Sequence, residues 1–234
     1  MTAKRKSRSA LALASGGKDS ILAIHLATSN GLDIKGIVTV IPEDPESMLY
    51  HTHNVLHVEE IARSIGAKWY PVEAPESEEE ESLSTALTSL DATTLVTGGI
   101  ASKYQKIRFE RIGRQAGMDV HSPMWNMNQE EVLERIVKMG FDTIIISVAA
   151  YGLGEEWLGR HLDYVNVNKL LSLSQSCQFN IVGEGGEYDT LVLDAPFYTK
   201  RLEPTKVLRH WYGDRGRLEI VEMSSVDKGV KIDA

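Results

Sequence analysis

The sequence predicts an α/β protein, with a parallel, helix-covered sheet in the N-terminal part and a smaller α/β domain after it. Two observations support this fold class. From residue 9 to about residue 116, short apolar runs alternate with segments whose apolar residues recur at helical spacing. After about residue 125, the pattern changes to one amphipathic segment, one buried strand and a glycine-rich stretch. We therefore expect two domains, residues 9–125 and residues 126–234.

The N-terminal domain should open with a buried strand at residues 9–14, since this segment is apolar and leads directly into glycines. A helix is expected to begin at Lys18 and to end near Gly31. The remaining elements follow the same alternation, with strands at residues 34–41, 68–72 and 94–97 and helices at residues 55–65 and 103–116.

The C-terminal domain is expected to contain a helix around residues 132–137 and a buried strand at residues 143–148. Two more strands should occupy residues 207–223, because a Gly-Asp-Arg-Gly turn at residues 213–216 divides this segment. In the N-terminal domain, the glutamate run at residues 76–81 is expected to be the solvated start of a helix. Adjacent carboxylates point around a helix and do not converge on a metal ion.

The composition restricts the classes of function. The 234 residues carry a net charge of −8, which argues against a nucleic-acid partner because phosphate binding needs a cationic surface. A single cysteine, Cys177, excludes an intrachain disulfide and a zinc cluster. No apolar run approaches the roughly 20 residues of a membrane span. We therefore expect a cytoplasmic protein without a membrane partner, and the sequence leaves a homodimer open.

The strongest local motif, which we call the glycine-rich loop, joins the first expected strand to the first expected helix: Ser15, Gly16, Gly17, Lys18, Asp19 and Ser20. Small residues let backbone N–H groups approach phosphate oxygens, and a helix N-terminus adds partial positive charge. Lys18 offers a cation, and Asp19 offers a carboxylate for capping or for Mg²⁺. A Walker A loop is excluded, because Ala12 and Asp19 stand where it needs glycine and serine or threonine. The alternative is a Gly-Gly turn with a serine cap.

A second motif, which we call the acidic loop, occupies residues 183–190 and combines three glycines with three carboxylates and an aromatic ring. Glu184, Glu187 and Asp189 are suited to a cationic or amine substrate. The ring of Tyr188 is suited to a quaternary ammonium group. The alternative is a hairpin turn with solvated carboxylates.

The glycine-rich loop resembles the phosphate loop of the N-type ATP pyrophosphatases, and nearly the whole chain resembles the diphthine–ammonia ligase family within that group. Six segments carry the second resemblance: SGGKDS at 15–20, MLYHTHN at 48–54, GGIASKYQKIRFE at 98–110, PMW at 123–125, YGLGEEWLGR at 151–160 and EGGEYDT at 184–190. The resemblance implies an adenine nucleotide alpha hydrolase-like fold (HUP, or PP-loop) for the N-terminal domain. One residue departs from the family pattern, because Asp189 stands where the family usually carries glutamate.

The resemblance also implies a reaction. The family amidates diphthine, a modified histidine of elongation factor 2 that bears a trimethylammonium group, with ammonium. ATP activates the carboxylate as an acyl-adenylate, and AMP and pyrophosphate are released. The expected cofactors are therefore ATP and Mg²⁺, and the expected protein partner is elongation factor 2 carrying diphthine.

The expected site residues follow from the two loops and from the resemblance. Lys18 is expected to neutralise the departing pyrophosphate, and Glu187 or Asp189 to accept a proton from ammonium. The nucleotide is expected to contact the six residues of the glycine-rich loop together with Thr39, Val40, Gly98 and Gly99, with Asp19 as the Mg²⁺ ligand. The substrate is expected to contact Tyr104, Gln105, Arg108, Glu184, Gly186, Glu187, Tyr188 and Asp189. A solvated helix face is the alternative for residues 104–110.

Two other functions compete with amidation. One is a different PP-loop adenylating enzyme that modifies tRNA, which a salt-dependent tRNA shift in a gel would support. The other is an ATP-binding sensor without turnover. Release of pyrophosphate on addition of the substrate would separate an enzyme from a sensor.

Overall fold

The computed structural model describes residues 8–43, 52–75 and 78–228, with only the backbone at residues 8, 52 and 53. The chain forms two compact units. The first unit comprises Met1–Ser15, Asp19–Val58 and Ala67–Met127. The second comprises Gly16–Lys18, Glu59–Gly66 and Asn128–Ala234. The main division therefore follows Met127, and three residues of the glycine-rich loop belong to the second unit.

A five-stranded parallel sheet forms the centre of the first unit, in the order β3-β2-β1-β4-β5. Its strands are β1 (Arg8–Leu13), β2 (Leu32–Pro42), β3 (Lys68–Ala74), β4 (Thr94–Val96) and β5 (Asp119–His121). The parallel α/β fold class is thus confirmed. The first four strands lie where the sequence predicts them, whereas β5 is an additional strand.

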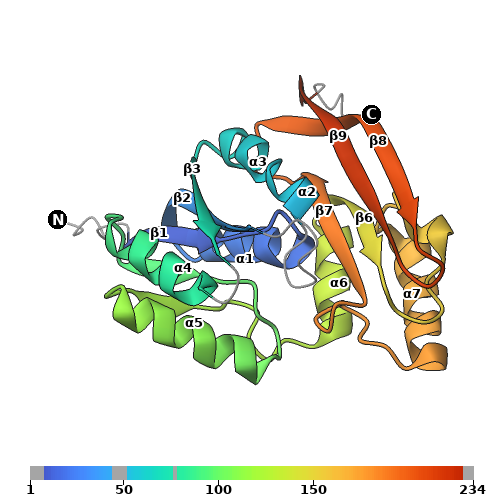
Figure 1. Cartoon of the computed structure of the whole chain (residues 1–234), viewed down its shortest axis with the longest axis horizontal. Helices are drawn as coiled ribbons and strands as arrows, with labels where there is room; N and C mark the ends of the chain where they lie inside the picture. The colour runs from blue at the N-terminus through green and yellow to red at the C-terminus, as the bar shows by residue number, and fades with distance from the viewer. Residues whose placement is uncertain (1–7, 44–51, 76–77, 229–234) are drawn as a thin grey trace. The chain divides into compact units, whose positions relative to one another are not determined.

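Helices connect these strands: α1 (Lys18–Ser29), α2 (Thr52–Val55), α3 (Val58–Ser64), α4 (Glu79–Thr88) and α5 (Lys103–Gln115). Crossovers between parallel strands are right-handed. The chain crosses from β1 to β2 in one direction and from β4 to β5 in the opposite direction, so α1 and α5 cover opposite faces of the sheet. Figure 1 shows α4 and α5 together on one face.

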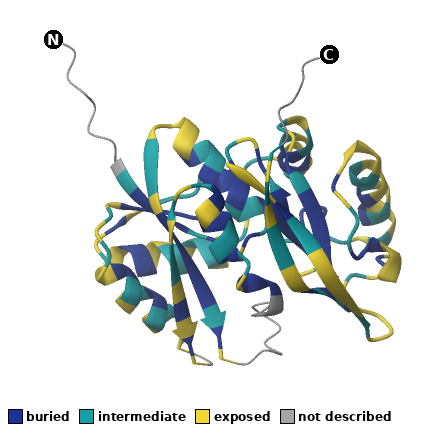
Figure 2. Cartoon of the chain, turned by 90° about the horizontal axis from the view of Figure 1, so that it is seen from above, coloured by how far each residue is buried: buried dark blue, intermediate teal, exposed yellow. Residues whose placement is uncertain are grey.

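An apolar cluster of the first unit lies between the sheet and the pair α4–α5. The strand residues Leu11, Val38 and Leu95 are at most 2% exposed and pack with Leu87 of α4 and Ile112 of α5. Figure 2 shows this inside–outside division, with buried residues along the strands and exposed residues on the outer helix faces. Burial of this apolar surface is the main force that holds the helices on the sheet.

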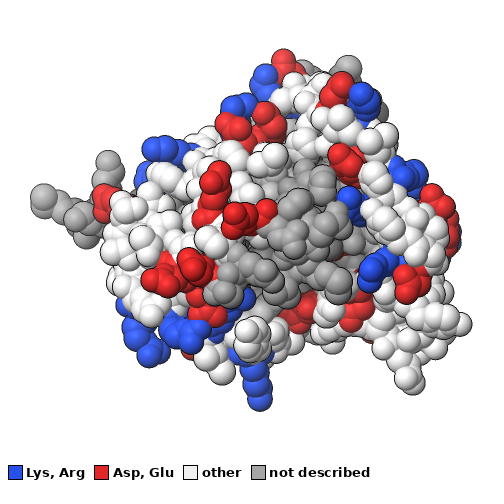
Figure 3. Space-filling view, viewed as in Figure 1, with Lys and Arg blue, Asp and Glu red and all other residues white. Residues whose placement is uncertain are grey.

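Ion pairs join α4 to α5. Arg108 Nε lies 2.9 Å from Glu80 Oε1, and Arg108 Nη2 lies 3.6 Å from Glu79 Oε2. Arg111 also contacts Glu80. Figure 3 shows the acidic side chains over α4 next to basic side chains over α5. The helix start predicted at the glutamate run is present, but its first two glutamates bind arginines instead of being merely solvated.

The second unit contains a four-stranded antiparallel sheet in the order β7-β6-β9-β8. Its strands are β6 (Asp142–Val148), β7 (Tyr188–Asp194), β8 (Lys200–Trp211) and β9 (Gly216–Asp227). Strands β8 and β9 pair along their whole length, whereas β9 pairs with β6 only at Arg217 and Gly216. The two strands therefore form the long ribbon seen in Figure 1. The predicted turn at residues 213–216 is confirmed, and both of its strands extend beyond the predicted segment.

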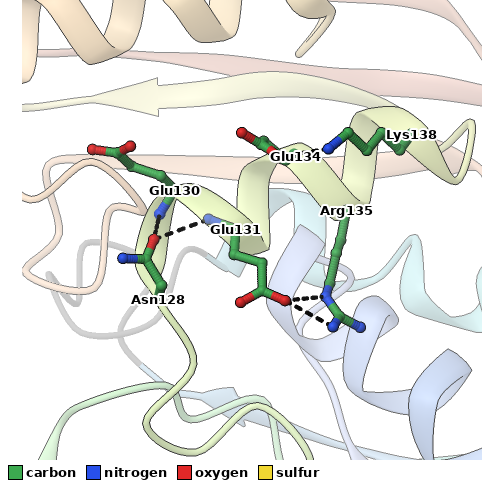
Figure 4. Close-up of polar contacts among 6 residues, drawn as sticks. All are labelled: Asn128, Glu130, Glu131, Glu134, Arg135 and Lys138. Atoms are coloured by element: carbon green, nitrogen blue, oxygen red, sulfur yellow. Dashed lines mark hydrogen bonds and ion pairs between the residues drawn. The ribbon is translucent and has the colours of Figure 1, made fainter.

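Helix α6 (Gln129–Lys138) follows its sequence pattern closely. Asn128 caps its N-terminus, because Asn128 Oδ1 accepts the N–H groups of Glu130 and Glu131 at 2.9 and 3.1 Å. Val132, Leu133 and Ile136 form its buried face. The exposed face carries two pairs at the i, i+4 spacing, Glu131–Arg135 and Glu134–Lys138 (Figure 4).

A long connection leads from β6 to α7 (Tyr164–Cys177) and contains the 3₁₀ helix η1 (Glu155–Trp157). Asp163 caps α7 by accepting the N–H of Asn166 at 2.7 Å. The α/β character predicted for this part of the chain is confirmed. Across the described residues, no helix has both the length and the apolar character needed to cross a bilayer.

Candidate active site

The first unit has a topological switch point between β1 and β4, the two neighbouring strands from which the chain departs in opposite directions. In open α/β sheets, ligands bind at the carboxyl ends of the strands beside such a point. The glycine-rich loop follows β1, and Gly98 and Gly99 follow β4. The residues of these segments that belong to the first unit, such as Ser15 and Gly98, therefore follow strands at the expected edge of the sheet.

Gly98 makes a close backbone approach to the start of α1. A Cβ atom at residue 98 would lie 2.9 Å from both the carbonyl carbon of Asp19 and the backbone nitrogen of Ser20. Only glycine permits this contact, since backbone atoms cannot move aside as a flexible side chain can. A Cβ atom at Gly99, in contrast, would meet no atom within 4 Å. Gly98 therefore allows the chain after β4 to pass close to the start of α1, whereas Gly99 has open space where a side chain would lie.

Thr39 ties the strands of this edge together. Its hydroxyl donates to the carbonyl of Ala14 at 3.0 Å and accepts from Trp69 Nε1 at 3.0 Å. Thr39 is 1% exposed, and the neighbouring Val40 belongs to the apolar cluster. Both side chains face inward, so the prediction that these residues contact adenine concerns their backbone atoms alone.

In the second unit, the glycine-rich loop is bound to β7. The backbone N–H of Lys18 donates to Thr190 Oγ1 at 3.0 Å, and the N–H of Val192 donates to the carbonyl of Gly16 at 3.0 Å. Gly16 has a φ of +83°, a conformation that favours glycine. The structure thus brings residues 16–18 together with the strand that continues the acidic loop.

The side chain of Lys18 faces the interior of the second unit. It is 2% exposed, and its Nζ donates to the carbonyl of Val182 at 2.5 Å. The same Nζ lies 5.1 Å from the centre of the Tyr188 ring. The sequence predicts a phosphate-facing cation here, whereas the structure places the ammonium group on a carbonyl and an aromatic face.

The carboxylate of Glu187 holds the acidic loop in shape. Its Oε1 accepts the N–H of Asn180 at 3.0 Å, and its Oε2 accepts the N–H of Gly185 at 2.8 Å. The carbonyl of Glu187 accepts the N–H groups of Ala149 and Ala150 at 2.8 and 3.2 Å. Each carboxylate oxygen is thus bound to a backbone donor, which gives Glu187 a structural role in addition to the predicted catalytic one.

Tyr188 differs from the expectation of a substrate-facing ring. It is 1% exposed, its hydroxyl donates to the carbonyl of Ile181 at 2.7 Å, and Lys18 Nζ lies over its ring. The cause is the start of β7 at this residue, which turns the ring into the core. The remaining predicted residues of the acidic loop are half-buried or exposed: Glu184, Gly186 and Asp189.

The predicted substrate residues of α5 lie in the first unit. Tyr104 is 73% exposed, and the N–H of Gln105 donates to Ser102 Oγ at 3.3 Å as part of the helix cap. Arg108 is occupied by the two glutamates of α4 described above. Of the three, Tyr104 therefore presents the most accessible surface.

The described residues contain no cluster of three or more His, Cys, Asp or Glu side chains that could hold a metal ion by themselves. Mg²⁺ needs no such cluster, because it is commonly bound by one or two carboxylates together with substrate phosphates. Asp19 is half-buried in the first turn of α1. The expectation that Asp19 is a Mg²⁺ ligand stays a prediction.

The sequence did not predict three groups that make contacts in this site: the hydroxyl of Thr190, the carbonyl of Val182 and the N–H of Asn180. Thr190 belongs to the EGGEYDT segment, so its inclusion in that motif was the only available signal. The other two act through backbone atoms, which have no signature in the side-chain sequence.

The parallel sheet, its switch point and the glycine-rich loop define the class of doubly wound α/β proteins that bind ligands at strand carboxyl ends. Comparison with known proteins identifies the family within this class. Models for the N-terminal and C-terminal domains of diphthamide synthase match residues 8–120 and 128–226. The chain belongs to the diphthamide synthase family, whose matched relatives are ligases.

The matched relatives include several that carry the name diphthine–ammonia ligase. The one from Schizosaccharomyces pombe is 32% identical, and the match covers 87% of this chain but 38% of the relative. The one from Bos taurus is 30% identical, with 85% of this chain and 84% of the relative covered. The one from Homo sapiens is 29% identical, with 82% and 80% covered. The chain thus spans most of the length of the mammalian relatives and a little over a third of the yeast one.

Proposed function

We propose that this protein amidates diphthine on elongation factor 2 with ammonium, using ATP, in the cytoplasm. The products are diphthamide, AMP and pyrophosphate. The observation that carries the proposal is the attachment of the glycine-rich loop to β7 through Lys18 and Thr190. This attachment supports the proposal because, within the second unit, it joins residues 16–18 of a phosphate-binding type of loop to the strand that continues a loop rich in carboxylates.

The nucleotide is held by the glycine-rich loop. Backbone N–H groups of this loop and the N-terminus of α1 bind the phosphates, with Asp19 as the ligand for Mg²⁺. The N–H of Lys18 is excluded from this role, because Thr190 accepts it. When bound, ATP supplies the adenylyl group that converts a carboxylate oxygen of diphthine into a leaving group.

The acidic loop handles the nitrogen substrate. Ammonia at neutral pH is mostly ammonium, so a carboxylate near the acyl carbon must hold the cation and accept its proton. Glu184 and Asp189 are suited to hold this cation. We assign proton acceptance to Asp189, because both oxygens of Glu187 already accept backbone N–H groups. Glu187 then fixes the loop conformation that presents Asp189.

A single reaction tests the proposed function. The protein is incubated with ATP, Mg²⁺, ammonium and elongation factor 2 that carries diphthine, and the modified histidine is analysed by mass spectrometry. Conversion of the acid to the amide is expected, and omission of either ATP or ammonium should abolish it. Failure to form the amide with all components present would contradict the proposal.

A further inference from the structure

Tyr151 is more exposed than any other large hydrophobic side chain among the described residues, at 87%. It lies in the connection between β6 and η1, two residues after Ala149. The face of this ring is open to a ligand that approaches from the solvent. Its surroundings therefore matter for the function of the second unit.

The turn that carries Tyr151 is held in a defined conformation. The N–H of Leu153 donates to the carbonyl of Ala150 at 3.1 Å, which closes a turn with Tyr151 and Gly152 at its centre. Gly152 has a φ of +94°, and a Cβ atom there would lie 2.5 Å from Cys177 Sγ. The positive φ favours glycine at residue 152, and the turn packs closely against Cys177 of α7.

The turn is also attached directly to the acidic loop. Ala149 and Ala150, the two residues before Tyr151, donate their N–H groups to the carbonyl of Glu187 at 2.8 and 3.2 Å. Tyr151 is thus one residue away from a hydrogen bond to the loop proposed to handle diphthine. Tyr188, the ring that the sequence favours for a cation, is buried and already faces Lys18.

The charges of both segments favour a cationic ligand. Residues 149–159 and residues 183–199 contain no lysine or arginine. The same two segments contain the carboxylates Glu155, Glu156, Glu184 and Asp189. They also contain Asp194, which pairs with Lys228, and Glu187, whose oxygens accept backbone N–H groups. An exposed aromatic ring on a segment that carries carboxylates and no lysine or arginine is suited to a quaternary ammonium group.

We propose that Tyr151 binds the trimethylammonium group of diphthine through a cation–π contact. The inference rests on the proposed function, since it names the part of the substrate that the acidic side of the second unit recognises. The trimethylammonium group of diphthine would then bind at Tyr151. The free ammonium that supplies the amide nitrogen would bind at the carboxylates of the acidic loop.

Three variants test the role of the ring: Tyr151→Ala, Tyr151→Leu and Tyr151→Phe. Loss of the π face in the Ala and Leu variants should raise the KM for diphthine-bearing elongation factor 2 by about 3- to 30-fold, with the KM for ATP unchanged. Tyr151→Phe retains the π face and should stay within about twofold of the parent protein. Equal activity of the Ala variant, or a Phe variant as defective as Ala, would overturn the proposal.

Tyr212→Ala is the matched control. Tyr212 is also an exposed tyrosine of the second unit that precedes a glycine with positive φ, Gly213 at +96°, but it lies in the β8–β9 turn. This variant should leave the KM for the protein substrate unchanged. The same increase in KM for Tyr151→Ala and Tyr212→Ala would show a general surface effect and would overturn the specific role of Tyr151.

A binding measurement separates failure of this inference from failure of the proposed function. Tetramethylammonium chloride serves as the probe, and saturation transfer from the protein to its methyl protons is recorded by NMR. Transfer should occur with the parent protein and Tyr151→Phe and be lost with Tyr151→Ala. If the parent protein amidates no diphthine, the proposed function fails, but the probe still tests Tyr151. Transfer that is equal for the parent and Tyr151→Ala would overturn the inference in either case.

Discussion

The backbone N–H of Lys18 donates to Thr190 Oγ1 across 3.0 Å, although 172 positions separate the two residues in the sequence. Thr190 is 6% exposed, so this bond is shielded from water. It connects the residue that begins α1 to the strand that continues the acidic loop. A substitution at Thr190 is therefore expected to alter the conformation of the glycine-rich loop at Lys18.

Replacing Thr190 with valine removes the acceptor while keeping the shape of the side chain. A buried N–H without a partner costs ~1–3 kcal/mol, so the glycine-rich loop should lose its defined position. We expect the KM for ATP to rise about tenfold, equivalent to ~1.4 kcal/mol. Steady-state kinetics measure this change. Thr190→Ser keeps the hydroxyl and should remain close to the parent protein; a serine variant as weak as valine would contradict the role of the hydroxyl.

Gly98 and Gly99 form a natural pair for testing the nucleotide edge of the first unit. Gly98→Ala would press a Cβ atom to 2.9 Å from the backbone at Asp19 and Ser20, so it should displace the start of α1. ATP binding, measured by calorimetry, is expected to weaken at least about tenfold. Gly99→Ala meets open space and should bind ATP normally. Equal effects of the two changes would show that the close approach is unimportant.

Substitutions of Asp189 and Glu187 are expected to have different effects, one on the rate of amide formation and the other on thermal stability. Asp189→Asn removes the proposed proton acceptor and should slow amide formation at least about 100-fold, with ATP affinity retained. Glu187→Gln replaces one acceptor oxygen by a donor, so one backbone N–H loses its partner and the melting temperature should fall. Single-turnover rates and thermal melts separate the two effects. A stable Glu187→Gln protein with the slower chemistry would move the proton acceptor to Glu187.

His161 and Asp142 give the second unit a pH-dependent contact. His161 Nδ1 lies 2.5 Å from Asp142 Oδ1. The hydrogen bond to Asp142 raises the pKa of His161 above 6.5, against an opposing effect of burial. The hydrogen bond from His161 likewise lowers the pKa of Asp142 below 3.8, with Arg201 adding a smaller effect.

The signs of these shifts define the pH range of the stabilisation. The contribution of His161 is complete below pH 6.5 and is lost as the pH rises through the folded-state pKa. The contribution of Asp142 is complete above pH 3.8 and is lost as the pH falls through its folded-state pKa. Between pH 3.8 and pH 6.5, the parent protein should therefore have a higher melting temperature than His161→Gln. This difference should disappear at alkaline pH. An equal difference at pH 5.5 and pH 9 would contradict the contact.

Much of the first unit could be predicted because its central strands contain short, nearly continuous apolar runs, as at residues 10–13 of β1 and 37–41 of β2. Strand β5 was missed, since its three residues include only one apolar side chain, Val120. The start of α7 was also hidden, because Tyr164 and Val165 there are exposed and break the expected apolar pattern. The spacing of apolar residues thus identifies helices and strands with a regular buried face. It misses short or partly exposed elements whose position depends on contacts with neighbouring elements.

The candidate site was predictable as two motifs but not as an arrangement of atoms. The glycine-rich loop and the acidic loop are visible in the sequence because glycine, lysine and carboxylates are concentrated there. The direction of the Lys18 side chain and the burial of Tyr188 depend on contacts between residues more than 160 positions apart. Tyr151 was not chosen from sequence, because a tyrosine in a turn has no signature until its exposure and its neighbours are known.

The central claim is that the nucleotide on the glycine-rich loop is cleaved between its α and β phosphates to activate the diphthine carboxylate. Phosphorus NMR of the complete reaction, with diphthine-bearing elongation factor 2, ammonium, Mg²⁺ and ATP, measures this directly. The account predicts AMP and pyrophosphate in amounts equal to the amide formed. Production of ADP and orthophosphate in step with amide formation would contradict it.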